Sequence, residues 1–251
     1  MIDVRGKRAL VTGGSRGIGA ATALLLAEGG ADVGIGYRSR ADDAAAVVHQ
    51  IAAAGVRGFA HAADLATPEG VAALFERAER ELGGLDLFVG NAGIWPAEEV
   101  ALADMDDVRW RRTMAENVDA MFYTARAAAR AVGDGGRIVL VSSTAGQRGE
   151  AMHADYAASK GAMISLVKSL AIELAPRQVT VNAVAPGWVD TEMVAGALAG
   201  DVMTRVAASI PLGRVASPRD IAGPIVFLCS DLARHVTGEI LNVNGGSVLC
   251  G

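Results

Sequence analysis

Short apolar runs alternate with longer stretches of helical character along the whole chain. The runs expected to form strands are residues 8–11, 32–37, 57–61, 85–89, 136–141, 179–184 and 239–243. The stretches expected to form helices are residues 18–28, 41–54, 67–83, about 105–132, about 154–174 and 218–228. Strands that alternate with helices predict an α/β fold, with a parallel sheet covered by helices on both faces. The near-continuous apolar character of the runs is typical of strands buried on both faces.

Turn and cap residues mark where these elements begin and end. Thr67 followed by Pro68 predicts a helix start, with Thr67 as the N-cap, and Gly83 predicts its end. The stretch from residue 188 to about residue 217 is the one long connection without a clear element. Long connections in compact domains are often lids or binding loops, so this stretch is the candidate substrate lid.

Composition narrows the class of protein. The 251 residues are 51% hydrophobic but only 4% aromatic, so Ala, Val and Leu must build the core. A net charge of -5 without a basic block argues against nucleic acid as a partner. No apolar run reaches the ~18 residues of a membrane helix, and the first residues lack a signal peptide's apolar stretch. Cys229 and Cys250 fit no metal or redox spacing, so we expect free thiols, no metal and a cytoplasmic protein.

Tyr156 and Lys160 are the most informative pair of residues. Positions i and i+4 of a helix share one face, and the chain holds only three tyrosines. An ammonium group beside a phenol lowers the phenol's pKa, which is otherwise about 10. A phenol tuned in this way can serve as a general acid or base. The structural alternative is a Tyr–Lys pair on an exposed helix face.

A glycine-rich turn follows the first predicted strand and opens the first predicted helix. Its sequence is Thr-Gly-Gly-Ser-Arg-Gly-Ile-Gly, from Thr12 to Gly19. Glycines let the backbone approach a pyrophosphate, and the helix N-terminus offers free N–H groups. This context favours dinucleotide binding over a plain turn.

The end of the second predicted strand indicates which dinucleotide binds. An acidic residue there would bind the ribose hydroxyls of NAD, but the chain has no carboxylate before Asp42. Arg38 and Arg16 could instead hold a 2′-phosphate through their planar guanidinium groups. We therefore expect NADP(H) to be preferred over NAD(H). The alternative is that Arg38 and Arg40 are solvated loop residues.

Together with further motifs, these residues resemble the short-chain dehydrogenase/reductase family over nearly the whole chain. The matching positions are, in chain order, Thr12, Gly13, Gly17, Gly19, Asp64, Leu65, Asn91, Ala92, Gly93, Asn117, Ser143, Tyr156, Lys160, Pro186, Gly187 and Thr191. The chain departs from the family pattern at Gly90, where an asparagine is usual. The resemblance implies a single Rossmann-type domain over residues 1–251. Its doubly wound parallel sheet would have about seven strands in the order 3-2-1-4-5-6-7.

The resemblance also implies roles for individual residues. Tyr156 would protonate the developing alkoxide and Ser143 would hydrogen-bond the same oxygen, while Lys160 would lower the Tyr156 pKa. Asn117 would support a water that leads to Lys160; Ser142 is the alternative serine. The implied cofactor residues are Gly13, Ser15, Arg16, Gly17, Ile18, Gly19, Tyr37, Arg38, Ser39, Asp64, Leu65, Asn91, Ala92, Gly93, Tyr156, Lys160, Pro186, Gly187, Val189 and Thr191.

The substrate is less clearly indicated. The expected pocket residues are Trp95, Ser143, Thr144, His153, Tyr156, Trp188 and Met193. His153 more often caps such a helix or faces solvent than touches substrate. Residues 37–39 and 241–246 resemble the 3-oxoacyl-thioester reductase branch, whose carrier docking uses basic residues. Arg177 stands where one is expected, but Asp134 stands where another would be. A coenzyme A thioester or a free ketone is therefore as plausible as a carrier-bound substrate.

Two rival functions stay open at this point. One is a dehydrogenase of secondary alcohols, sugars or cyclic diols that uses the same residues. The other is a dinucleotide-binding sensor without catalysis, although Asn117, Ser143, Tyr156 and Lys160 are all present. The helix expected at 154–174 is apolar on nearly all faces, so it must be covered on more than its sheet side. We expect a homotetramer, with a dimer as the alternative.

Overall fold

The computed structural model describes residues 2–249, so Cys250 lies outside the described residues. The strands are β1 (Arg8–Thr12), β2 (Asp32–Tyr37), β3 (Gly58–Ala62), β4 (Leu85–Gly90), β5 (Val132–Val141), β6 (Thr180–Pro186) and β7 (Ile240–Val243). The helices are α1 (Gly17–Glu28), α2 (Ala41–Ala53), α3 (Pro68–Leu82), α4 (Asp107–Met114), α5 (Ala120–Ala131), α6 (Ala145–Arg148), α7 (Ala154–Leu174), α8 (Asp201–Ser209) and α9 (Pro218–Cys229). None of the helices in the described part of the chain could cross a membrane.

The strands form one seven-stranded parallel sheet in the order β3-β2-β1-β4-β5-β6-β7. In the centre, Ala9 of β1 pairs with Val33 of β2 on one side and with Leu87 of β4 on the other. The predicted doubly wound order is thereby confirmed. Because all strands run in one direction, their carboxyl ends meet along one edge of the sheet, where ligands of such folds bind.

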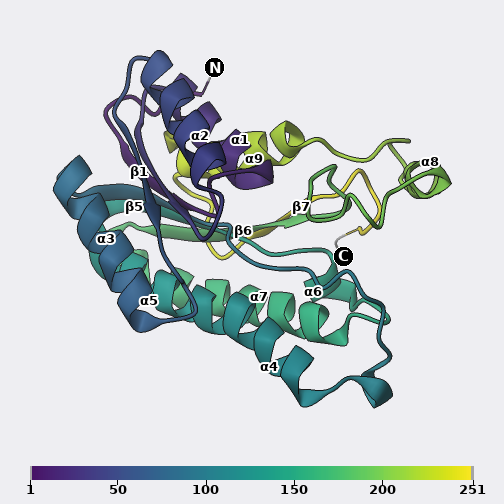
Figure 1. The fold of residues 1–251 in the computed structure, drawn as a ribbon. Coiled ribbons are helices and arrows are strands. Elements are labelled where there is room, and N and C mark those ends of the chain that lie inside the picture. The colour runs from purple at the N-terminus through teal and green to yellow at the C-terminus, as the bar shows by residue number, and fades with distance from the viewer. Residues whose placement is uncertain (1, 250–251) are drawn as a thin grey trace.

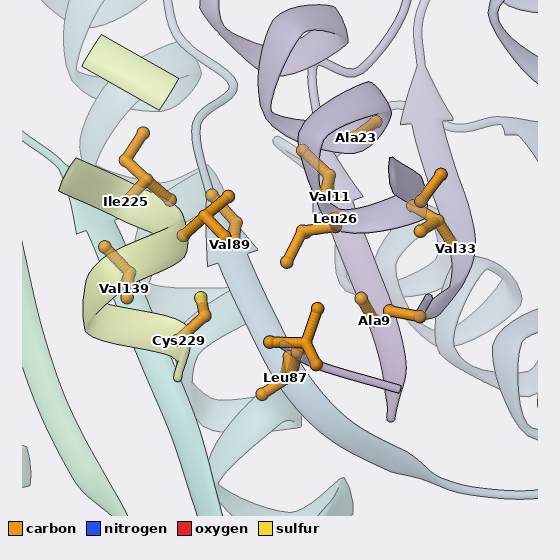
Figure 2. Close-up of a cluster of buried hydrophobic side chains, with 14 of the residues drawn as sticks. Ala9, Val11, Ala23, Leu26, Val33, Leu87, Val89, Val139, Ile225 and Cys229 are labelled. Carbon is orange, nitrogen blue, oxygen red and sulfur yellow. The ribbon is translucent and has the colours of Figure 1, made fainter. Parts of the chain in front are cut away.

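Helices cover both faces of the sheet (Figure 1). Helices α1, α2 and α9 lie on one face, while α3, α4, α5 and α7 lie on the other. Alternate strand residues serve the two faces: Val89 packs under α1 and α9, whereas its neighbour Phe88 packs on the opposite face. Figure 2 shows the first cluster, in which Leu26 of α1 and Ile225 of α9 meet Val89. Cys229 is a buried free thiol in this cluster.

The start of α3 follows its sequence signals. The Thr67 hydroxyl accepts a hydrogen bond from the Gly70 N–H at 3.1 Å, and Pro68 occupies the first turn. Gly83 ends the helix in the left-handed conformation with a φ of 74°. The predicted cap residues are confirmed at both ends.

The predicted helix over 105–132 and strand over 136–141 are wrong in detail. The helical stretch is interrupted by a π-helical turn, Ala115–Asp119, which separates α4 from α5. Strand β5 begins at Val132, which is buried and pairs with Leu85, and the register shifts before Arg137 pairs with Leu87. The glycine-rich residues between the two pairs permit this irregularity. The connection over 188–217, expected to be irregular, contains helix α8.

Candidate active site

Two adjoining cavities lie at the carboxyl edge of the sheet. The larger, of about 280 Å³, is lined by residues that follow β1, β2, β3 and β4. The smaller, of about 160 Å³, is lined by residues that follow β4, β5 and β6 and by α7. Ile18, Asn91, Gly93, Thr191 and Met193 line both cavities, so the two form one continuous site. Every predicted cofactor residue except Gly19 lines one of them.

The glycine-rich turn forms a tight cradle beside the first helix. Gly13 and Gly17 have φ values of 64° and 56°, a region that favours glycine. A Cβ on Gly19 would collide with the Gly13 carbonyl oxygen and lie 2.6 Å from the Asn91 amide nitrogen. The N-cap residue of α1, Arg16, makes no side-chain cap hydrogen bond, and the first turn carries no acidic residue. This cradle fits a pyrophosphate at a helix N-terminus.

Asn91 fastens the loop after β4 to this cradle. Its side-chain amide donates to the carbonyl oxygens of Thr12 at 3.0 Å and Gly13 at 3.2 Å. The Thr12 hydroxyl accepts the backbone N–H groups of Asn91 and Ala92. The predicted Asn91 site residue therefore acts on the shape of the cradle as well as lining the cavity.

Arginines gather at the end of the larger cavity, next to β2. Arg38 pairs with Glu116 and lies 3.7 Å from Asp64. Arg16 and Arg40 both pair with the Oε2 atom of Glu192, at 2.6 and 2.9 Å. The alternative that Arg38 and Arg40 are merely solvated loop residues is therefore too simple, because both are exposed but ion-paired. Arg16, Arg38 and Arg40 all line the larger cavity, and guanidinium groups suit the recognition of an anionic group such as a phosphate.

Tyr156, Ser143 and Lys160 meet in the smaller cavity. The Ser143 hydroxyl lies close enough to the Tyr156 phenol to lower its pKa, and it accepts the Ala145 N–H at 3.1 Å. The Ser142 hydroxyl is buried and donates to the Lys160 carbonyl oxygen at 2.9 Å. Of the two serines, Ser143 is therefore the one whose hydroxyl faces the tyrosine.

The predicted lowering of the Tyr156 pKa is wrong for the protein alone. Burial raises the pKa of Tyr156 to about 12. The negative charge of Glu150 also raises this pKa, whereas the hydrogen bond with Ser143 lowers it. The Lys160 Nζ lies 5.7 Å from the Tyr156 ring centre and donates to the Val141 carbonyl oxygen at 2.9 Å. Burial also lowers the pKa of Lys160 to about 8. Desolvation is the main cause of both pKa shifts, because both groups are withdrawn from water.

Asn117 lies in the π-helical turn and lines neither cavity. Its Oδ1 accepts the Ile94 N–H at 2.7 Å, and its Nδ2 donates to the Ile94 carbonyl and to the Ser159 hydroxyl, each at 3.0 Å. A π-helical turn often marks a functional position in a helix. Asn117 thus ties the loop after β4 to helix α7. Both hydrogens of its side-chain amide are used within the protein, so they are not free to hold a water.

Aromatic side chains wall the smaller cavity. Trp95 packs edge-on against Trp188 with ring centres 6.1 Å apart, and it stacks on His153 at 4.8 Å. The Trp95 indole N–H donates to Glu150 at 3.3 Å. His153 is buried, lines neither cavity and makes no side-chain cap hydrogen bond to α7. It occupies the N-cap position of α7, in line with the expectation that it caps the helix, and it supports Trp95 from behind instead of lining the substrate pocket.

Several residues of the site were not expected from the sequence. Glu116, Arg40 and Glu192 line the larger cavity, and Ser247 lines the smaller one. Glu192 follows directly after the predicted Thr191, but its arginine partners lie 152 and 176 residues away in the chain. No short sequence motif reports contacts at such separations.

A dinucleotide cleft joined to a pocket with Tyr, Ser and Lys defines the class of a nicotinamide-dependent oxidoreductase. Residues 13–247 match a family model described as enoyl-(acyl carrier protein) reductase. The chain is 41% identical to a 3-oxoacyl-(acyl-carrier-protein) reductase of Vibrio cholerae, over 98% of both chains. It is 43% identical to a cis-4-hydroxycyclohexanecarboxylate dehydrogenase of Sinomonas cyclohexanicum, over 95% of both chains.

A solved structure has the same fold. It is a short-chain dehydrogenase from Burkholderia cenocepacia in complex with NADP, at 41% identity and a TM-score of 0.91 over 97% of this chain and 98% of that chain. The chain belongs to the short-chain dehydrogenase/reductase family. It is an NAD(P)-dependent oxidoreductase that acts on a CH–OH or C=O group of a small molecule.

Proposed function

We propose that the protein is an NADP(H)-dependent reductase of ketones, and that 3-oxoacyl thioesters are its main substrate class. One observation carries the proposal: the Tyr156 phenol and the Ser143 hydroxyl share a cavity that opens into the arginine-rich cleft. Two hydroxyl donors in one water-poor pocket can hydrogen-bond a single carbonyl oxygen and stabilise the negative charge that develops there.

The raised pKa of Tyr156 suits the proton donor that ketone reduction requires. With a pKa of about 12, the phenol stays protonated at neutral pH and is ready to donate its proton to the alkoxide. A bound nicotinamide dinucleotide supplies the hydride. Ser143 would hold the same oxygen, and Lys160, on the face of α7 shared with Tyr156, would bind the cofactor ribose. Asn117 would keep the loop after β4 and helix α7 in register.

The cofactor preference rests on the charges at the adenosine end. Strand β2 ends without a carboxylate, and Arg16, Arg38 and Arg40 lie together in the cleft. A guanidinium group suits the bidentate recognition of a phosphate. The relative from Burkholderia cenocepacia, which binds NADP, agrees with the preference for NADP(H).

The next question is whether the acyl group of the substrate is attached to a carrier protein or to coenzyme A. Arg177, the residue expected to dock an acidic carrier protein, pairs with Asp134 at 2.9 Å and donates to the Ala129 carbonyl oxygen at 2.7 Å. A guanidinium held in this way is less available to a partner. We therefore favour a coenzyme A thioester or a free ketone over a carrier-bound substrate.

A second candidate is the oxidation and reduction of cyclic hydroxy acids. The cyclohexanecarboxylate dehydrogenase relative motivates it, and so do the flat walls that Trp95 and Trp188 provide for a ring. Arg148 lines the same cavity, is exposed, and has no ion pair within residues 2–249. Its guanidinium could face a substrate carboxylate.

The test is NADPH consumption with three compounds: acetoacetyl-coenzyme A, 4-oxocyclohexanecarboxylate and crotonyl-coenzyme A. Reduction of the first supports the thioester proposal, reduction of the second supports the ring acid, and reduction of the third alone would indicate enoyl reduction. Tyr156→Phe should lower turnover on a ketone by about 10²–10⁴-fold, the usual range for a general acid, with NADPH affinity nearly unchanged. Tyr123→Phe on α5, outside both cavities, is the control. Near-normal turnover of Tyr156→Phe would refute the assignment.

We further propose that the protein is a homotetramer in which α7 packs against a second copy. The outer face of α7 carries the exposed small residues Ala158 and Ala162, and Ile172 is 77% exposed. On the neighbouring helices, Val108 is 75% exposed and Phe122 is 45% exposed. Light scattering after size exclusion should give the mass of four chains, or of two if only the first interface forms. A monomeric mass at micromolar concentration would contradict the proposal.

The segment over 188–217 is proposed as a lid on a single domain. Helix α8 has no buried residue, whereas Trp188 and Met193 at the start of the segment line the smaller cavity. Helix α8 itself can move with little loss of core packing, because the buried residues of the segment, Val189, Leu198 and Ile210, lie outside the helix.

A further inference from the structure

Glu192 fills an anion site made by two arginines of the cofactor cleft. Its Oε2 atom accepts the Arg16 Nη1 at 2.6 Å and the Arg40 Nη2 at 2.9 Å. Two guanidinium groups that converge on one oxygen provide the arrangement that a phosphate oxygen would use. The carboxylate that occupies it belongs to the chain itself.

The carboxylates around Arg38 differ from Glu192 in where they are anchored. Glu116 belongs to the π-helical turn, and Asp64 accepts the Ala66 N–H at 3.1 Å, so both belong to the frame of the cleft. Glu192 instead lies on the proposed lid, one residue after Thr191, and its side chain is 55% exposed. It can leave the arginines by a side-chain rotation, which the two frame carboxylates cannot do as readily.

We infer that Glu192 determines how strongly the protein distinguishes NADP(H) from NAD(H), because its carboxylate competes with the 2′-phosphate for Arg16 and Arg40. The inference rests on the proposed use of NADP(H). A cofactor without the phosphate leaves both ion pairs intact. A cofactor with the phosphate must displace Glu192 before Arg16 and Arg40 can bind it, while Arg38 stays in place.

The size of the expected change in affinity follows from the solvent exposure of the ion pairs that Glu192 forms with Arg16 and Arg40. Arg16 and Arg40 are 45% and 52% exposed, and ion pairs at such positions each contribute modestly. Removal of the carboxylate by Glu192→Gln should therefore tighten binding of a 2′-phosphorylated ligand about five-fold, which is about 1 kcal/mol. It should leave a ligand that lacks the phosphate unchanged.

The test is calorimetric titration of the full-length protein with adenosine 2′,5′-bisphosphate and with 5′-AMP, neither of which contains the nicotinamide. Glu28→Gln is the matched control, because Glu28 forms a similar exposed pair with Arg219 at 2.8 Å, at residues that line neither cavity. Tighter binding of the bisphosphate alone, in Glu192→Gln alone, supports the inference. Unchanged or weaker bisphosphate binding overturns it, as does an equal gain for both ligands. Weaker AMP binding with no gain for the bisphosphate also overturns it and makes Glu192 a ribose ligand.

The same titration separates this inference from the proposed function. If the wild-type protein binds AMP as tightly as the bisphosphate, the proposed preference for NADP(H) fails. Even in that case, tighter binding of the bisphosphate relative to AMP in Glu192→Gln would support competition between Glu192 and the 2′-phosphate. Ketone reduction plays no part in the readout, so an inactive preparation that still binds nucleotides remains informative.

Discussion

The buried charge of Lys160 should destabilise the folded protein at neutral pH. The variant Lys160→Met, which removes this charge, should show the size of the destabilisation. The lysine is 5% exposed, and burial lowers its pKa from 10.5 to about 8. Its Nζ donates to the Val141 carbonyl oxygen at 2.9 Å and lies 3.8 Å from the Met163 sulfur. No carboxylate forms an ion pair with it in the described part of the chain. Methionine has a similar length and carries no charge.

The sign of the effect follows from proton linkage. Below pH 8 the lysine is charged in both the folded and the unfolded protein, so the folded state bears the whole cost, about 3 kcal/mol. Between pH 8 and pH 10.5 the unfolded chain binds the proton that the folded protein has lost. Stability of the wild type therefore rises with pH across this window, and the cost falls by about 2.5 kcal/mol between pH 7 and pH 10.

Methionine also removes a hydrogen bond. The Val141 carbonyl oxygen loses its donor, which costs about 1–3 kcal/mol for a buried acceptor. This cost is the same at both pH values, because a neutral amine still donates. At pH 7 the variant should thus be about as stable as the wild type or up to about 2 kcal/mol more stable, whereas at pH 10 it should be less stable.

The assay is urea denaturation followed by tryptophan fluorescence at pH 7 and pH 10, at one protein concentration. Lys168→Met is the matched control, because Lys168 is exposed on the same helix and its ammonium group is not withdrawn from water. The reasoning is refuted if the stability difference between Lys160→Met and the wild type is the same at both pH values. It is also refuted if Lys160→Met becomes more stable relative to the wild type as the pH rises.

Two further predictions concern the cradle and the base of α7. Gly19→Ala should weaken binding of NADPH by at least about ten-fold, because the added Cβ collides with the Gly13 carbonyl oxygen and with the Asn91 amide and so displaces the glycine-rich turn. An unchanged dissociation constant in a fluorescence titration would contradict this. Asp155→Asn should lower the free energy of unfolding by about 3–5 kcal/mol, because it removes the buried carboxylate that pairs with the half-buried Arg109 at 3.1 Å. Burial opposes the charge of Asp155, but hydrogen bonds from Arg109 and Thr113 keep its pKa below the ordinary value, so this stabilisation should fade at acidic pH. A loss under 1 kcal/mol in urea denaturation at pH 7 would count against the Asp155 argument.

The fold was largely predictable because its signals are local. Periodicity placed β2 and α7 at their observed bounds, and Thr67 and Gly83 marked the ends of α3. The π-helical turn was not predictable, because its residues have ordinary helical character. The contacts that Asn117 makes there, with Ile94 and Ser159, join residues far apart in the chain.

The candidate site was predictable where a motif is short and not where charges meet across the chain. The turn from Gly13 to Gly19 and the Tyr156–Lys160 pair are local. The carboxylates that hold the arginines are not, since Arg38 and Glu116 are 78 residues apart. The pKa of Tyr156 was also misjudged, because spacing reports the neighbouring lysine but not the burial that raises the phenol's pKa.

Helix α7 shows how one segment can carry both the chemistry and its support. Tyr156 and Lys160 form one i,i+4 pair that lines the cavity. Asp155 and Ser159 form a second pair, offset by one residue and fully buried. Asp155 accepts the Thr113 hydroxyl at 2.8 Å, and Ser159 accepts the Asn117 amide at 3.0 Å while donating to the Tyr156 carbonyl oxygen.

A one-residue offset rotates a side chain by about 100° around the helix, so the second pair faces α4 and the π-helical turn while the first faces the cavity. Buried polar groups are costly unless they are satisfied, and their partners therefore restrict the helix to one rotation and one height. A shift of α7 by a fraction of a turn would break the contacts of Asp155 and Ser159 before it moved the Tyr156 phenol far. The position of the proposed proton donor is thus set by its sequence neighbours, and only indirectly by the apolar packing of α7 on the sheet.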